Sequence, residues 1–131
     1  MSILGHRVST KVVATVAGCL LLAALLPAVT RTPTREVVLV VKGMTFYLES
    51  DLTTPNPIIE ARAGERVRVV IRNQDRGLIH DFAVPAIGAV THEIPWNQSD
   101  EVAFDVPDTP GVYEYVCRPH RLMMRGTIRV Y

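Results

Sequence analysis

The stretch YEYVCRPHRLMMRG, residues 113–126, decides how this chain is interpreted. Tyr115 and Cys117 share one face of a β-strand if the segment is extended, because successive side chains point to opposite faces. Pro119 has no N–H to continue a strand ladder, so a loop must follow the cysteine. His120 lies on that loop, three residues after Cys117. The stretch therefore predicts a strand that ends in a thiol and a loop that brings an imidazole back toward it.

Most of the chain around this stretch has the same strand-like pattern. In the run that follows the turn at residues 63–65, Val67, Val69 and Ile71 fall on one face of a strand, and the other face carries Arg66, Arg68 and Arg72. Strand-like runs cover residues 37–42, 44–49, 66–73, 100–106, 109–117 and 126–131. Pro, Gly and Asn separate them, and no window has the period of an amphipathic helix. The pattern predicts about seven short strands in an all-β fold, an antiparallel Greek-key sandwich or barrel.

The N-terminal residues have the composition of a targeting segment. Two basic residues precede an apolar run at residues 12–26, which is short for a bilayer span of about 20 residues. A cleaved signal peptide, a retained membrane anchor helix and lipid attachment at Cys19 all remain open. We expect a signal or anchor with a linker at residues 1–32 and one domain at residues 33–131. The positive flank predicts that this domain lies outside the cytoplasm, for example in the periplasm.

Charge and cysteine content restrict what the domain can do. Residues 33–131 contain 11 Lys and Arg against 13 Asp and Glu, a net charge of −2, which speaks against nucleic acid as a partner. Cys117 is the only cysteine in this part of the sequence, so no disulfide can form within the domain. A lone thiol in an oxidising compartment is exposed to oxidation unless it is buried or coordinated. Cys117 is therefore expected to be a metal ligand.

A thiolate, an imidazole and a thioether within one short loop are typical ligands of a soft redox metal. Cys117 and His120 supply two of the three strong donors that a trigonal copper site requires. His80 and His92 are the candidates for the third, and the apolar strand-like context of His80 favours it. Any one of these residues alone is more often an ordinary core group. Together they indicate copper rather than structural zinc, which prefers four strong nitrogen or sulfur donors.

The segments HDFAVP at residues 80–85 and PGVYEYVCRPHRLMMRGTIRV at residues 110–130 resemble the cupredoxin family, in particular small blue-copper proteins of the plastocyanin and amicyanin type. The resemblance extends over residues 36–131. It implies that His80, Cys117 and His120 are the equatorial ligands of one copper ion and that Met124 is the axial ligand.

Two features depart from the family pattern. Asp81 stands where the family commonly has an asparagine after its first histidine, so the hydrogen bonding around the ligand loop is expected to differ. Met124 keeps the family's spacing to Gly126, whereas Met123 keeps the shorter spacing to His120 of amicyanin-type loops. Met123 therefore remains an alternative axial ligand.

The resemblance implies a mononuclear type 1 copper protein that cycles between Cu(I) and Cu(II) as a one-electron carrier and is not an enzyme. Strong equatorial donors and an axial thioether leave no open position for a substrate. The expected partner is a redox protein, a c-type cytochrome or a membrane oxidoreductase, that docks near His120. Membrane attachment through the N-terminal segment is a further expectation. A copper delivery or sensing module, and an accessory subunit of a membrane redox complex, are the alternative functions.

Overall fold

The computed structural model describes residues 34–131, which form nine β-strands and one short 3-10 helix. The elements are β1 (Arg35–Val41), β2 (Phe46–Leu48), β3 (Ile58–Ala61), β4 (Arg66–Asn73), β5 (Ala83–Val84), η1 (Pro85–Ile87), β6 (Ala89–Val90), β7 (Ser99–Asp105), β8 (Gly111–Val116) and β9 (Arg125–Val130). Within these residues, no helix is long and apolar enough to cross a bilayer. The predicted signal or anchor helix falls outside the described residues.

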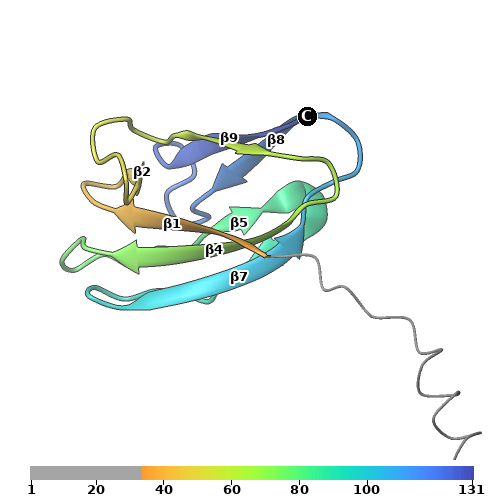
Figure 1. Ribbon diagram of the computed structural model, residues 1–131. Helices are drawn as coiled ribbons and strands as arrows, with labels where there is room; N and C mark the ends of the chain where they lie inside the picture. The colour runs from red at the N-terminus through yellow and green to blue at the C-terminus, as the bar shows by residue number, and fades with distance from the viewer. Residues whose placement is uncertain (1–33) are drawn as a thin grey trace, which may run out of the picture. The chain divides into compact units, whose positions relative to one another are not determined.

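The strands form two sheets that pack face to face (Figure 1). One sheet has the order β2-β1-β4-β7 and the other has the order β3-β9-β8-β5-β6. The predicted all-β sandwich is confirmed, since the strand-like runs of the sequence become β1, β2, β4, β7, β8 and β9.

The prediction of a purely antiparallel sandwich is wrong for two strand pairs. β1 runs parallel to β4, with Val37 opposite Val69, and β3 runs parallel to β9, with Ile59 opposite Ile128. The chain passes through β2 and then through β3 in the opposite sheet before it returns as β4. A connection of this length can bring a strand back in the same direction, which a two-residue hairpin cannot do.

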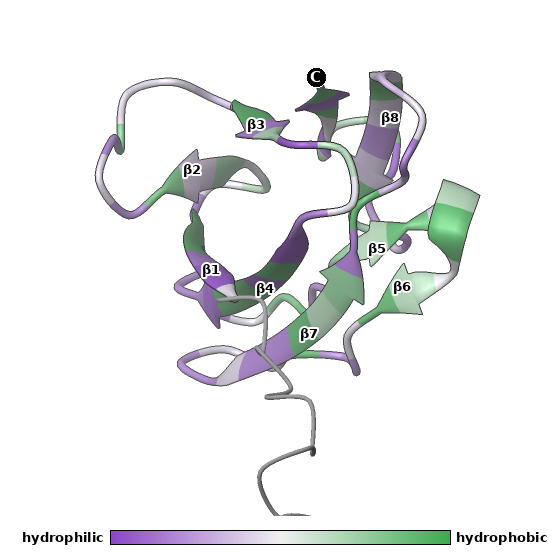
Figure 2. Ribbon diagram, turned by 45° about the vertical axis from the view of Figure 1, so that its right-hand side comes forward, coloured by the Kyte–Doolittle hydropathy of each residue, from purple (hydrophilic) through white to green (hydrophobic). Residues whose placement is uncertain are grey.

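The core lies between the two sheets and follows from the alternation of the strands. Along β4, Val67, Val69 and Ile71 are buried, while the arginines between and beside them face outward. In Figure 2, β4 carries both green and purple segments. Burying such a side chain stabilises the fold by roughly 1.5–3 kcal/mol. The hydrophobic faces of the two sheets therefore hold the sandwich together.

Three aromatic side chains form the centre of the core. The ring of Tyr115 lies 5.3 Å from Phe82 in a stacked arrangement and 5.5 Å from Phe46 in an edge-to-face arrangement. Burial raises the pKa of Tyr115, so its hydroxyl keeps its proton and donates a 2.6 Å hydrogen bond to the carbonyl oxygen of Pro57. The same ring lies directly against Gly126 on β9. Tyr115 thus joins β8, β9 and the segment before β3.

Candidate metal centre

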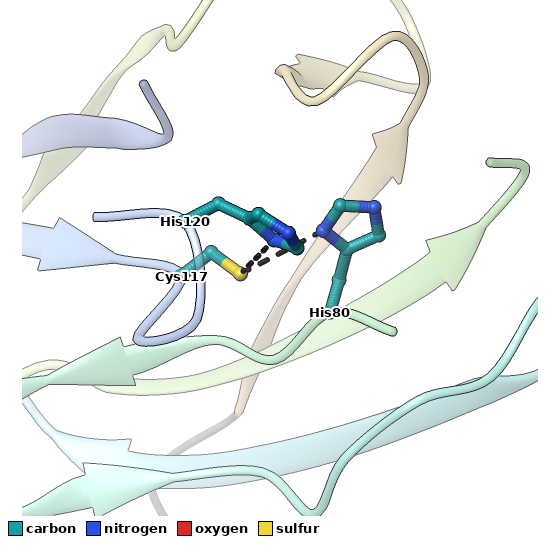
Figure 3. Close-up of side chains that lie close together, drawn as sticks. All are labelled: His80, Cys117 and His120. Carbon is teal, nitrogen blue, oxygen red and sulfur yellow. Dashed lines mark hydrogen bonds between the residues drawn. The ribbon is translucent and has the colours of Figure 1, made fainter. Parts of the chain in front are cut away.

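Three side chains from two segments converge at one end of β8. His80 precedes β5, Cys117 follows the last residue of β8, and His120 lies on the loop between β8 and β9. Their ligand atoms all lie within 4.8 Å of one another. The sulfur of Cys117 is 3.7 Å from Nδ1 of His80 and 3.6 Å from Nδ1 of His120 (Figure 3). Both rings therefore present the same nitrogen to the sulfur.

Backbone hydrogen bonds hold the loop that carries Cys117 and His120 in a tight turn. The N–H of Cys117 donates to the carbonyl of Met124 at 2.9 Å, and the N–H of Met124 donates to the carbonyl of His120 at 2.9 Å. Met124 is fully buried, whereas Met123 is 56% exposed. Burial therefore places the thioether of Met124, and not that of Met123, inside the sandwich with Cys117.

His80 is held by an antiparallel bridge to Ile94. The N–H of His80 donates to the carbonyl of Ile94 at 3.2 Å, and the N–H of Ile94 donates back at 2.7 Å. The buried amide of Asn73 donates to the carbonyls of Leu78 and Ile94 at 2.8 and 2.9 Å. Asn73, at the end of β4, thus fixes both segments that position His80. In the sequence, Asn73 can be recognised only as a polar residue at the end of a predicted strand.

Asp81 links the two segments that carry the site. Its carboxylate accepts the backbone N–H of Arg118 at 2.7 Å and the Nε–H of the same residue at 2.6 Å. Asp81 is 1% exposed, so a nearly dry carboxylate has both a peptide N–H and a guanidinium as partners. An ion pair therefore joins Asp81, the residue after His80, to Arg118, the residue after Cys117. This pair is the hydrogen bonding that an aspartate makes at the position where the family commonly has an asparagine.

Burial sets the protonation of the ligands in the protein without metal. It lowers the pKa of His80, more strongly than the nearby Asp75 raises it, so the imidazole favours its neutral form. Burial also raises the pKa of the Cys117 thiol, although the backbone N–H groups of Asp81 and His120 act in the opposite direction. Metal binding must therefore displace a proton from Cys117, which in its thiol form is protected against oxidation.

The structure does not bring His92 into this cluster. Its side chain is 96% exposed, and its Nδ1 lies 3.1 Å from the Oδ2 of Asp100. Of His80 and His92, the two candidates for the third donor, only His80 lies with Cys117 and His120.

Asp75 also contacts the site, although the sequence pattern does not indicate this. Its Oδ2 lies 3.1 Å from Nε2 of His80, on the side of the ring away from the sulfur.

The donor set fits a type 1 copper ion. One thiol and two imidazole Nδ1 atoms face each other at close range, and a buried thioether follows on the same loop. Two imidazoles, one thiolate and a weak thioether are the ligands of such sites. The cluster of His80, Cys117 and His120, with the buried thioether of Met124 on the same loop, therefore has the donors of a type 1 copper site.

A two-sheet β-sandwich with this donor set defines the class of small copper proteins that carry a single type 1 site. The comparison with sequence families is consistent with this class, because residues 15–130 match the family described as cupredoxin-like domain. The chain belongs to this family. Among curated proteins, no sequence matches the chain significantly.

Solved structures show the same fold at low sequence identity. Auracyanin B matches with a TM-score of 0.62 and 22% identity, over 79% of this chain and 93% of its own. Auracyanin A, a blue copper protein from Chloroflexus aurantiacus, matches with a TM-score of 0.60 and 18% identity, over 76% and 100%. Reduced rusticyanin matches with a TM-score of 0.56 and 24% identity, over 75% and 79%. These similarities establish the arrangement of the two sheets.

Proposed function

We propose that this protein is a one-electron carrier with His80, Cys117 and His120 as equatorial copper ligands and Met124 as the axial ligand. Bound copper supplies the Cu(I)/Cu(II) couple. The observation that carries the proposal is the assembled donor set, in which the ligand atoms of His80, Cys117 and His120 lie within 4.8 Å of one another and the side chain of Met124 is buried. Ligands held by core packing and by backbone hydrogen bonds need little rearrangement when the charge of the metal changes, which suits electron transfer.

The exposure of the ligands supports transfer of electrons rather than conversion of a substrate. His80, Cys117 and Met124 are buried, so no small molecule has direct access to these donors. His120 is the partly exposed ligand, and it lies in a shallow depression formed by residues 118–123. The imidazole of His120 is therefore the group through which a partner comes nearest to the metal.

The first test is a redox titration of the copper-loaded protein followed by visible absorption. We expect a blue Cu(II) form with an intense thiolate-to-copper band, which disappears on addition of one electron per protein and returns on reoxidation. Reversibility follows because the buried ligands keep their places in both states. A colourless Cu(II) form, or a form that loses its metal on reduction, would contradict the electron-carrier proposal.

A surface around His120 fits a transient redox partner such as a c-type cytochrome or a membrane oxidoreductase. Leu122 and Met123 are exposed apolar side chains on this loop. Electron-transfer complexes are small and short-lived, which suits a limited apolar patch. Arg118 and Arg121 line the same depression, Arg125 is the first residue of β9, and Arg129 lies further along that strand. Three of them are paired, namely Arg118 with Asp81, Arg121 with Glu114 and Arg129 with Glu60.

Arg125 is the arginine of this group that forms no ion pair among residues 34–131. If the partner is acidic, the electron-transfer rate should fall by about threefold as ionic strength rises from about 0.01 to 0.15 M, because the Debye length shrinks from about 30 to 8 Å. Stopped-flow measurements with the partner give this dependence. Arg125→Gln should weaken the dependence, whereas Arg66→Gln, which removes a charge from the other sheet, should not. A rate independent of salt would speak against steering by charge.

We also propose that the protein works outside the cytoplasm, in the periplasm or an equivalent compartment. The basic flank and apolar run before residue 33 support this location. Cell fractionation together with the intact mass of the purified protein tests it. The mass also distinguishes a cleaved, a lipidated and a retained N-terminal segment.

A further inference from the structure

Asp75 contacts a copper ligand from outside the donor set. Its Oδ2 lies 3.1 Å from Nε2 of His80, while Nδ1 of the same ring faces the sulfur of Cys117. An ionised carboxylate is only an acceptor, so the Nε2 of His80 must be the nitrogen that carries the proton. The lone pair of a neutral imidazole is then on Nδ1, the atom that faces the site. The position of Asp75 selects the tautomer that can bind metal.

A two-residue turn between β1 and β2 holds Asp75 in place. Gly43 and Met44 both have left-handed backbone angles, with φ of 60° and 52°, and the N–H of Lys42 donates to the carbonyl of Thr45 at 3.0 Å. This conformation turns two N–H groups toward Asp75. The N–H of Gly43 donates to Oδ1 at 2.5 Å and the N–H of Met44 donates to Oδ2 at 2.7 Å. The carboxylate is therefore oriented by a turn more than 30 residues away in the chain.

Asp75 is also the carboxylate at the site whose charge no cation offsets. Its side chain is only 11% exposed, and among residues 34–131 the one side chain with which it forms an ion-pair contact is His80. Asp81, the other acid beside the ligands, is paired with the guanidinium of Arg118. Weak exposure reduces screening by water, so the charge of Asp75 acts on His80 more strongly than a surface charge would.

We propose that Asp75 is a positioning residue that fixes the tautomer of His80 and biases the site toward Cu(II). A carboxylate on the outer nitrogen makes an imidazole ligand more basic, and a more basic, more negative environment stabilises the more highly charged metal state. This inference rests on the proposed function. It adds that the reduction potential of this protein depends on a residue that does not touch the metal.

The test compares Asp75→Asn with the wild type in the copper-loaded form. The amide has the same size and its oxygen can still accept from Nε2, so the blue band should remain while the charge is lost. Removal of an outer partner of a metal ligand typically costs about 10- to 100-fold in affinity. We expect Cu(II) affinity to fall about tenfold relative to Cu(I), which raises the reduction potential by about 59 mV for one electron.

A second readout needs no metal. In the wild-type apoprotein, nitrogen NMR should show His80 with its proton on Nε2, whereas Asp75→Ala should show both tautomers. The control is Asp100→Asn, because Asp100, like Asp75, lies 3.1 Å from a histidine ring nitrogen and accepts a backbone N–H, here that of the same histidine at 2.8 Å. That histidine, His92, is exposed and does not belong to the cluster of His80, Cys117 and His120. Asp100→Asn should leave both the potential and the tautomer of His80 unchanged.

The outcomes separate the inference from the proposal on which it rests. A wild-type protein without a blue copper form would overturn the proposed function, and the tautomer measurement would then still decide the role of Asp75. If the blue form is present but Asp75→Asn has the potential of the wild type, the bias toward Cu(II) is disproved. A loss of thermal stability in Asp75→Asn with an unchanged potential, together with an unchanged tautomer of His80 in Asp75→Ala, would show that Asp75 only stabilises the turn.

Discussion

Cys117→Ser is expected to abolish the blue absorption band and to lower Cu(II) affinity by more than about 100-fold. The sulfur of Cys117 lies 3.7 and 3.6 Å from the Nδ1 atoms of His80 and His120. Its thiolate supplies the charge of the donor set and the orbital from which the band arises. Removal of a group that hydrogen-bonds to a metal ligand typically lowers metal affinity by about 10- to 100-fold, so loss of a ligand itself should lower the affinity further.

The fold should survive this substitution. A serine hydroxyl at position 117 would be buried beyond hydrogen-bond distance of both ring nitrogens, because these lie 3.6 and 3.7 Å from the larger sulfur atom that it replaces. We therefore expect a loss of about 1–3 kcal/mol in the free energy of unfolding. Circular dichroism on the apoprotein checks this point, and copper titration gives the affinity. His92→Gln is the control, because that histidine is exposed and should leave the band unchanged. A blue Cys117→Ser protein would show that another residue supplies the thiolate's role.

Gly126→Ala is expected to lower the free energy of unfolding by about 4 kcal/mol. A Cβ atom at this position would lie 2.2 Å from both Cζ and Oη of Tyr115, closer than real Cβ contacts ever are. The ring cannot move aside, since it packs on Phe46 and Phe82 and its hydroxyl is bonded to Pro57. Overpacking costs about 1–3 kcal/mol and an unpaired buried polar group about as much again. For a domain of this size the melting temperature should fall by about 15 °C or more.

Thermal unfolding with a double-mutant cycle tests the origin of this loss. Thr127→Ala, at the next position of β9, adds no atom and should change stability by less than about 1 kcal/mol. Combining Gly126→Ala with Tyr115→Leu removes the overlapping ring, so the double variant should be more stable than the sum of the two single losses predicts. Simple additivity would mean that the overlap with Tyr115 is not the cause.

The sheets could be predicted where one face of a strand is uniformly apolar. On β4, Val67, Val69 and Ile71 fall on one face and are buried, whereas the three arginines fall on the other. β3 was missed because Ile58 is an exposed apolar residue beside the buried Ile59, which hides the period of two. The parallel pairing of β1 with β4 could not be predicted, since the alternation of a strand is the same in either direction and only the path of the chain decides it.

The residues of the site likewise fall into those that the sequence pattern indicates and those that only the folded structure reveals. Cys117 and His120 could be identified because a short loop brings them together, and His80 could be identified from its apolar surroundings. The two methionines are adjacent in sequence, and it is their burial in the folded chain that favours Met124, whose axial role stays a prediction. The hydrogen-bond partners of Asp75 and Asp81 could not be predicted from the sequence. Gly43, Met44 and Arg118 are 31 to 37 residues away from the carboxylates that they contact.

The hydrogen bond between the N–H of Cys117 and the carbonyl of Met124 closes a segment of eight residues that contains three of the four ligands. Its ends continue directly into β8 and β9, so the segment behaves as an exchangeable cassette between two fixed strands. A replacement loop of different length would alter the distance between thiolate and thioether and leave His80 with its support unchanged. The redox properties of such a scaffold can therefore diversify through insertions and deletions in one short loop, without any change to the core of the sandwich.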